Sequence, residues 1–104
     1  MKAETLKGHL DVLVLASLRD GPAHGYAVID ALERRSDGAF VFAEGTVYPV
    51  LHRLEAEGLL ASTWTVASGR RRRVYRLTRR GRTMLSARER DWRRFSTAVE
   101  AVLA

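Results

Sequence analysis

Arginine is the residue type in this sequence that is concentrated enough to suggest a chemistry. Residues 70–82 contain eight Arg and no acidic residue, whereas residues 1–69 contain six basic and nine acidic side chains. Guanidinium groups without compensating carboxylates attract a polyanion, and a nucleic acid is a better candidate than an anionic membrane surface. The alternative interpretation is a solvated surface that only keeps a small protein soluble, and the density of the block argues against it.

Residues suited to catalysis or metal binding lack the spacing that such sites use. The chain has no Cys, which excludes a cysteine nucleophile and a thiolate metal site. The three histidines, His9, His24 and His52, lie far apart in the sequence, and no serine has a G-x-S-x-G setting. Neither a P-loop nor a G-x-G-x-x-G stretch occurs. We therefore predict that the protein is not an enzyme and has no metal site.

Length and composition predict one compact domain. The 104 residues are 46% hydrophobic and 29% charged, as in ordinary folded proteins. The longest uninterrupted apolar runs, such as residues 12–16, are too short to cross a bilayer. The N-terminal residues lack the apolar segment and the cleavage site of a secretion signal. Together with the absence of Cys, these features predict a cytoplasmic protein without membrane association.

Hydrophobic periodicity predicts the elements that must position the Arg block. Apolar residues at helical spacing predict four helices, at about residues 6–19, 25–35, 46–57 and 78–103. For the third helix we expect Thr46 as the N-cap residue, Pro49 in the first turn and Gly58 as the left-handed C-terminal cap. Thr78 is expected to cap the last helix.

Two strands are predicted between the third and fourth helices, at residues 59–67 and 73–77. Ser68, Gly69 and the following Arg residues are expected to form the tip of the hairpin. The fold is therefore mainly α with a small β-hairpin, and a helix-turn-helix followed by a hairpin is the arrangement of a winged helix. We expect residues 1–77 to form the winged-helix DNA-binding domain and residues 78–104 to form a C-terminal dimerisation helix.

Three stretches of the sequence resemble the PadR family of bacterial transcriptional regulators. They are GPAHGY at residues 21–26, GTVYPVLHRLE at residues 45–55 and GRRRRVYRLT at residues 69–78. The middle stretch is the most specific, because a Thr-x-Tyr-Pro start followed by Leu-x-Arg-Leu-Glu is unusual outside this family. The resemblance covers nearly the whole chain, and the single helix after the hairpin is similar to the compact branch of the family.

The resemblance implies a role in transcription. It suggests a homodimer that binds double-stranded DNA sequence-specifically at an inverted-repeat operator, commonly as a repressor and without a cofactor. The alternative is a winged-helix module that binds nucleic acids non-specifically through the Arg block, or one that binds another protein.

The third helix is expected to be the recognition helix, which fits the major groove of DNA. Its candidate DNA-binding residues are Thr46, Tyr48, Pro49, His52 and Arg53. Arg53 could bind guanine or phosphate, or it could form an intramolecular salt bridge with Glu57 at i+4. Tyr48 could face the DNA, or it could pack in the core with its hydroxyl at the surface.

The hairpin is expected to form the wing and to contact the DNA backbone or the minor groove. Its candidate residues are Arg70, Arg71, Arg72 and Arg73. Because side chains alternate along a strand, Arg72 should point to the opposite side from Arg71 and Arg73. His24 and Tyr26, at the start of the second helix, are further candidates for phosphate contacts. The alternative for Tyr26 is packing against the third helix.

Apolar residues at heptad-like spacing predict that the last helix joins two copies of the chain. The predicted interface residues are Leu6, Leu10, Val14, Leu85, Trp92, Phe95, Val99 and Val102. Arg88 interrupts the series, and a monomer whose last helix folds onto its own core is the alternative. In some relatives, planar aromatic compounds bind at the dimer interface, so the resemblance makes Trp92 a candidate contact for a small aromatic effector. Plain packing between the two copies is the favoured role of Trp92.

Overall fold

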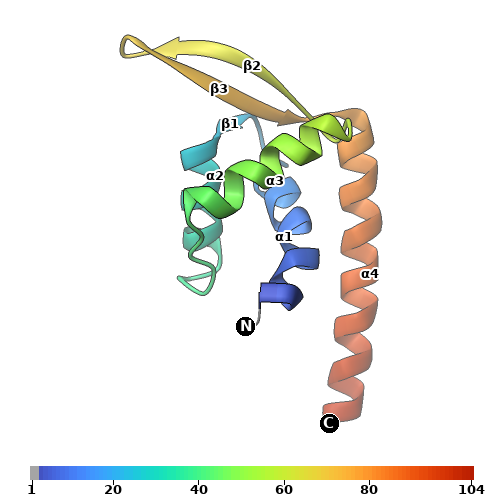
Figure 1. Ribbon diagram of the computed structural model, residues 1–104. Coiled ribbons are helices and arrows are strands. Elements are labelled where there is room, and N and C mark those ends of the chain that lie inside the picture. Colours follow the sequence, from blue (N-terminus) through green and yellow to red (C-terminus); the bar gives the residue numbers. More distant parts are fainter. Residues whose placement is uncertain (1–2) are drawn as a thin grey trace.

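The computed structural model describes the backbone of residues 3–104 and the side chains of residues 9–104. Its elements, in chain order, are α1 (Ala3–Ser17), β1 (Ala23–His24), α2 (Gly25–Arg35), α3 (Glu44–Ala56), β2 (Leu60–Ala67), β3 (Arg70–Leu77) and α4 (Arg79–Leu103). Figure 1 shows α1, α2 and α3 gathered on one side of the sheet, the β2–β3 hairpin extending beyond them, and α4 running alongside α1. The predicted fold class, mainly α with a small antiparallel sheet, is confirmed.

The hydrophobic core forms where α1, α2 and α3 meet the base of the hairpin. Val14, Val28, Val47, Leu51 and Leu54 are 0% exposed. Burial of each of these aliphatic side chains contributes roughly 1.5–3 kcal/mol, and three of the five lie along one face of α3. The opposite face of α3 is left in solvent, as expected for an amphipathic helix.

Helix α3 begins at Glu44, earlier than predicted. Ala43 is its N-cap residue and provides no side-chain cap, and the amide of Thr46 already donates to the Ala43 carbonyl at 3.0 Å. Thr46 therefore lies in the first turn and is not the N-cap residue. The carboxylate of Glu44 in the first turn interacts favourably with the helix dipole, which compensates for the missing cap. Pro49 lies beyond the first turn on the exposed face, where water can satisfy the carbonyl that lacks its helical donor.

The ends of the other elements follow the local signals in the sequence. Helix α2 has the predicted bounds, and Gly58 follows α3 with φ +80°, a conformation that favours glycine. Thr78 caps α4 as predicted, because its hydroxyl oxygen accepts from the Gly81 amide at 3.0 Å. The same hydroxyl donates to the Gly58 carbonyl at 2.7 Å, so one side chain joins the end of α3 to the start of α4.

The tip of the hairpin is shorter than predicted. Ser68 and Gly69 form the whole turn, with φ values of +52° and +75°, and strand pairing starts at once with Ala67 opposite Arg70. Positive φ at both central residues is typical of the two-residue turn whose twist matches that of the flanking strands. The Arg residues that we placed in the tip therefore belong to β3, which starts three residues earlier than predicted. We call the β2–β3 hairpin, residues 60–77, the wing.

A short strand that the sequence did not reveal ties α2 to the wing. In β1, Ala23 pairs with Tyr75 and His24 pairs with Val74, which places β3 in the middle of a sheet with the order β1-β3-β2. Two residues are too few for a strand periodicity, so only the tertiary pairing shows this element. The start of α2 is thereby attached to the base of the wing.

Helix α4 is buried at one end and exposed at the other. Leu85 packs in the core, whereas Trp92, Phe95 and Val102 are 52%, 60% and 85% exposed. Although α4 is the longest helix, neither it nor any other helix within residues 3–104 is apolar enough to cross a membrane.

Three residues that we assigned to the dimer interface lie elsewhere. Leu10, Val14 and Leu85 are buried in the core of a single chain, so they already have their packing partners and present no surface to a second copy. Apolar residues at helical spacing mark both a seam between two chains and a stripe that faces the core of one chain. The sequence pattern therefore could not distinguish these two positions. The side chain of Leu6 lies outside the residues whose side chains the structure describes.

Gly81 lies where α4 closely approaches Leu59, just before β2, and this leaves no room for a larger side chain. A Cβ atom at this position would overlap the carbonyl oxygen of Leu59, so we expect Gly81→Ala to destabilise the fold by about 2 kcal/mol or more in urea denaturation. Gly45→Ala is the control, because that position in α3 has open space around it. It should be neutral or stabilising by up to about 1 kcal/mol, owing to the higher helix propensity of Ala. Equal stabilities for the two variants would contradict the packing.

Candidate nucleic-acid interface

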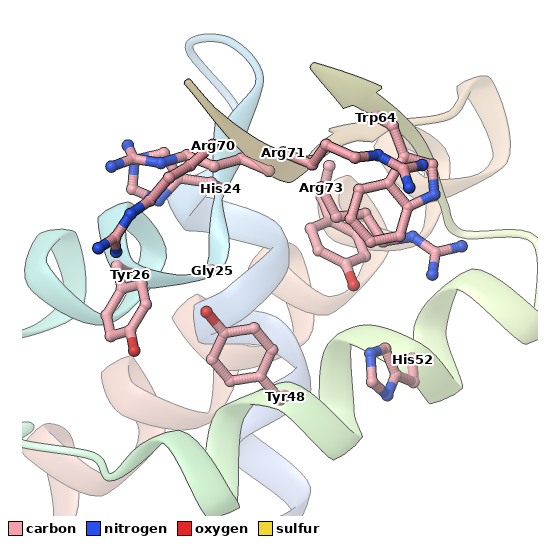
Figure 2. Close-up of a pocket in the computed structure, with 11 residues that line it drawn as sticks. His24, Gly25, Tyr26, Tyr48, His52, Trp64, Arg70, Arg71 and Arg73 are labelled. Atoms are coloured by element: carbon pink, nitrogen blue, oxygen red, sulfur yellow. The ribbon is translucent and has the colours of Figure 1, made fainter. Parts of the chain in front are cut away.

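A groove lies between the wing, the start of α2 and the exposed face of α3. It has a volume of about 350 Å³ and combines aromatic rings with guanidinium groups. Its lining residues are His24, Gly25, Tyr26, Tyr48, His52, Trp64, Arg70, Arg71, Arg72, Arg73 and Tyr75. Figure 2 shows Tyr48 and His52 rising from α3 on one side and Trp64 with Arg71 and Arg73 on the other. Most of the predicted DNA-binding residues are thus brought to one side of the molecule.

Tyr48 is a half-buried ring with its hydroxyl in this groove. Its ring packs so closely on α2 that a Cβ atom on Gly25 would lie 2.5 Å from Tyr48 Cζ. Burial, together with the negative charge of Glu44, raises the pKa of the Tyr48 hydroxyl. The hydroxyl is therefore protonated at neutral pH and can donate a hydrogen bond. Tyr48 therefore matches the second alternative, in which the ring packs in the fold and the hydroxyl lies at the surface.

Tyr26 is exposed and packs edge-on against Tyr48. The two ring centroids are 6.1 Å apart with an interplanar angle of 77°, so the packing against α3 that we considered for Tyr26 is present. A hydrogen bond with the Glu44 carboxylate raises the pKa of the Tyr26 hydroxyl, and the negative charge of Glu44 adds to this effect. The hydroxyl of Tyr26 is therefore protonated at neutral pH.

Arg53 forms intramolecular ion pairs on the exposed side of α3. Its guanidinium contacts Asp11 of α1 and, at 3.1 Å, Glu57 at i+4. Hydrogen bonds to these two carboxylates, the one to Asp11 first, raise the pKa of Arg53. The pair with Glu57 was the alternative that we considered from the sequence. The pair with Asp11 spans 42 residues of sequence and could not be inferred from a local spacing.

Arg73 is also held within the chain. Its Nε donates to Ser62 Oγ at 2.7 Å, its Nη2 lies 3.4 Å from Glu55 Oε1, and Ser62 in turn donates to Glu55 at 2.5 Å. Glu55 belongs to α3, whereas Ser62 and Arg73 belong to the two strands of the wing. This network therefore orients the wing relative to α3.

Arg70, Arg71 and Arg72 differ from Arg73 because none of them has a carboxylate partner among residues 9–104. Arg72 Nη1 lies 3.1 Å from His24 Nε2, and Arg71 lies over the ring of Trp64. Arg76, nearer the base of β3, is also exposed and has no carboxylate partner among these residues, but it does not line the groove. Arg70, Arg71 and Arg72 are therefore the unpaired guanidinium groups of the groove that remain available to an external anion.

His24 caps α2, a role that the sequence did not suggest. Its Nδ1 accepts the amide of Ala27 at 3.3 Å. A neutral imidazole that accepts at Nδ1 carries its proton on Nε2, so Arg72 cannot donate to that atom. Only Nη1 of Arg72 lies near His24, so the other N–H groups of this guanidinium stay free.

Trp64 is the groove residue that the sequence analysis missed as a functional candidate. Leu60, Trp64 and Val66 stand at alternate positions of β2 and therefore share one face of the wing, but only Leu60 is buried. The core ends below Trp64, whose ring faces the groove and two guanidinium groups instead. A signal was present in the sequence, since an aromatic residue in one predicted strand and Arg residues in the next can form a cation–π contact across the hairpin.

Comparisons with known proteins agree with this geometry. The sequence model of the PadR-like family of transcriptional regulators matches residues 14–87. The chain belongs to this family. A PadR-family crystal structure from Eggerthella lenta is 37% identical, with a TM-score of 0.80 over 96% of this chain and 86% of that one. A transcriptional regulator of Mycobacterium tuberculosis is 44% identical over 73 residues, which are 70% of this chain and 65% of that protein.

A further structure supports the fold alone. A transcriptional regulator from Clostridium thermocellum superimposes with a TM-score of 0.85 at 24% identity, over 96% of this chain and 95% of that one.

PadR-family members are DNA-binding transcriptional regulators, so the chain is a regulator rather than an enzyme. The groove and the exposed face of α3 are therefore candidates for the surface that meets DNA.

The difference between paired and unpaired arginines predicts two different salt dependences. Arg72→Ala should lower the slope of log affinity against log salt concentration by about 1 per bound chain, because one phosphate contact is lost. Arg53→Ala should leave the slope unchanged, since Asp11 and Glu57 already neutralise that guanidinium. Binding of a random duplex, followed by fluorescence anisotropy at several salt concentrations, measures both.

The charge-preserving variant Arg72→Lys is the control and should keep the wild-type slope. A lower slope for Arg53→Ala would show that its ion pairs open when DNA binds, and would return Arg53 to the set of DNA-contacting residues.

Proposed function

We propose that the protein is a homodimeric repressor that binds an inverted-repeat operator, with α3 in the major groove and the wing on the adjacent backbone. One observation carries this proposal: the exposed face of α3 lies beside three wing guanidinium groups that have no carboxylate partner in residues 9–104. A helix of this kind fits the major groove, and an unneutralised cation beside it fits the phosphate backbone. A protein bound at an operator that overlaps a promoter blocks that promoter, and this is the repression that we propose.

The exposed residues of α3 are suited to a DNA surface. Thr46 lies in the first turn, where the helix dipole favours a phosphate, and Pro49 and His52 lie on the exposed face. The Tyr48 hydroxyl can donate to a phosphate or a base edge from the same side. These four residues are our proposed α3 contacts, and Arg53 contributes to the position of α3 through Asp11.

The wing supplies the electrostatic part of the binding. If Arg70, Arg71 and Arg72 each neutralise one phosphate, a dimer neutralises about six, and the slope of log affinity against log salt should be about −5. Binding should therefore weaken steeply with salt on any DNA, while preference between sequences should depend on α3.

The exposed half of α4 supports dimerisation. Trp92 and Val99 lie seven residues apart, as do Phe95 and Val102, and all four side chains are exposed in the single chain. An exposed apolar strip of this kind is rare on a monomer, and the same strip of a second copy covers it with heptad-like packing. A two-fold axis through this seam would present two α3 helices to half-sites about one DNA turn apart.

We assign Trp92 primarily to packing between the two copies. Its ring contacts Phe95 at 6.0 Å and the His9 ring of α1 at 5.5 Å between centroids, so it lies between α4 and the body of the chain. A small aromatic effector that stacks on Trp92 would alter the angle between the copies and so relieve repression. Thermal shift measurements with planar aromatic compounds test this part. If every compound changes the Tm of Trp92→Leu by as much as it changes the Tm of the wild type, the role of Trp92 in effector binding is contradicted.

The experiment that tests the main proposal is competition between nucleic acids. An inverted repeat from the DNA next to the coding region should bind more tightly than a random duplex of equal length and than an RNA duplex. Equal affinity for all three would reject promoter recognition and favour non-specific binding through the Arg block.

Tyr48 should contribute to sequence preference. We expect Tyr48→Ala to lower the affinity for the inverted repeat about tenfold while changing the affinity for random DNA much less, as for the loss of one base contact. Tyr48→Phe keeps the ring that packs on Gly25 and removes only the hydroxyl, so it separates a contact from a packing defect. Equal losses on both DNAs would contradict a reading role for Tyr48.

The seam should depend on Trp92. Trp92→Glu would bury a charge between the two copies, so light scattering should give the mass of a monomer. Val41→Glu places the same charge on an exposed apolar residue between α2 and α3, and should leave the dimer intact. A dimer that persists in Trp92→Glu would exclude this seam.

A further inference from the structure

The arginines of the wing differ in their partners within the chain. Trp64 contacts both Arg73, which has a carboxylate partner, and Arg71, which has none in the described part of the chain. The guanidinium carbon of Arg71 is 4.6 Å from the centroid of the Trp64 ring, and that of Arg73 is 5.4 Å away. Arg73 is fixed by Ser62 and Glu55, as described above. Arg71 is held by Trp64 alone and has no carboxylate partner in the described part of the chain.

The strand register produces this arrangement. Trp64 is paired with Arg73 and Val66 with Arg71, so these four side chains share the face of the hairpin that also carries the buried Tyr75. That face is turned toward α3 and forms one wall of the groove (Figure 2). Trp64 and Arg71 therefore face the same space as the Tyr48 hydroxyl.

A guanidinium stacked on an aromatic ring keeps its N–H groups free at the edge of the plane. The ring face attracts the cation, whereas the donors point outward, where they can meet an oxyanion. An exposed Arg loses much side-chain freedom when it binds a phosphate, and stacking removes part of that loss in advance. Trp64 is 55% exposed, so core packing does not account for its position.

We infer that Trp64 is a positioning residue for DNA binding: it holds the Arg71 guanidinium over the groove, where Arg71 donates to one backbone phosphate of the duplex. Trp64 contributes through Arg71 and does not stack on a base, because Arg71 already lies over its ring. Arg73, neutralised by Glu55, supports the ring from the neighbouring position and is not a phosphate contact. This inference rests on the proposed function and adds a residue that acts through another one.

A double-mutant cycle on the full chain separates these roles. The wild type, Trp64→Leu, Arg71→Ala and the double variant are compared for affinity toward a random duplex and toward the inverted repeat. Trp64→Leu should weaken both affinities about fivefold and leave the salt slope unchanged, because the charge of Arg71 is retained. Arg71→Ala should lower the slope by about 2 for a dimer. In the Arg71→Ala background, Trp64→Leu should change affinity by less than about twofold.

Two further variants control for side effects on the fold. Trp64→Phe keeps an aromatic face and should retain most of the affinity that Trp64→Leu loses, although the two replacements are similar in size. Val66→Ala changes an exposed residue of the same strand and face, directly opposite Arg71, and should bind as the wild type does. Circular dichroism and urea denaturation establish that each variant is folded.

The outcomes separate this inference from the proposed function. Additive losses in the cycle would overturn the inference, because Trp64 would then contact DNA directly. Wild-type affinity in Trp64→Leu, or equal affinities for the Phe and Leu variants, would also overturn it while DNA binding by the wild type stands. A wild type that binds no duplex at low salt would overturn both.

Discussion

The register of the wing is the constraint on which the candidate DNA-binding surface depends. Ser68 and Gly69 at the tip have positive φ, and Tyr75 and Leu77 at the base are buried in the core, so strand pairing is determined at both ends. A slip of one residue would turn Tyr75 out of the core and move every neighbouring side chain to the other face of the hairpin. Burial of Tyr75 and Leu77 in the core thereby determines which guanidinium groups of β3 face the groove, although these groups do not contact the core themselves.

Carboxylates on neighbouring elements determine which of these cations remain available. Asp11 and Glu57 neutralise Arg53, and Glu55 neutralises Arg73, so α3 and the wing offer less positive charge to a polyanion than the sequence suggests. Ion pairs at such half-exposed positions contribute at most about 1 kcal/mol each to stability. Their larger effect is on the orientation of the elements, because they link α1 to α3 and α3 to the wing at the surface. The hydrophobic core below already holds these elements together.

Helix α4 connects this surface to the proposed dimer. Its first turns belong to the core through Leu85. Its middle is tied to the turn after α1 by the ion pair of Glu89 with Arg19, and Arg93 and Arg19 lower the pKa of Glu89. The apolar residues beyond this point are exposed, and they continue the same unbroken helix. A partner that covers them would therefore be held at a defined angle to α3 and the wing, as two half-sites on one face of DNA require.

Features that depend on residues within one turn, or on a simple period, could be predicted from the amino-acid sequence. The bounds of α2, the cap at Thr78 and the left-handed Gly58 were all predicted, because capping and periodicity act locally. The family also followed from short stretches of sequence. The tertiary structure alone decided the ion pair of Arg53 with Asp11, the pairing of β1, the burial of Leu10 and the position of Trp64 beneath Arg71. Each of these depends on the distance between segments that lie far apart in the chain or on where the core ends, and no local pattern encodes either.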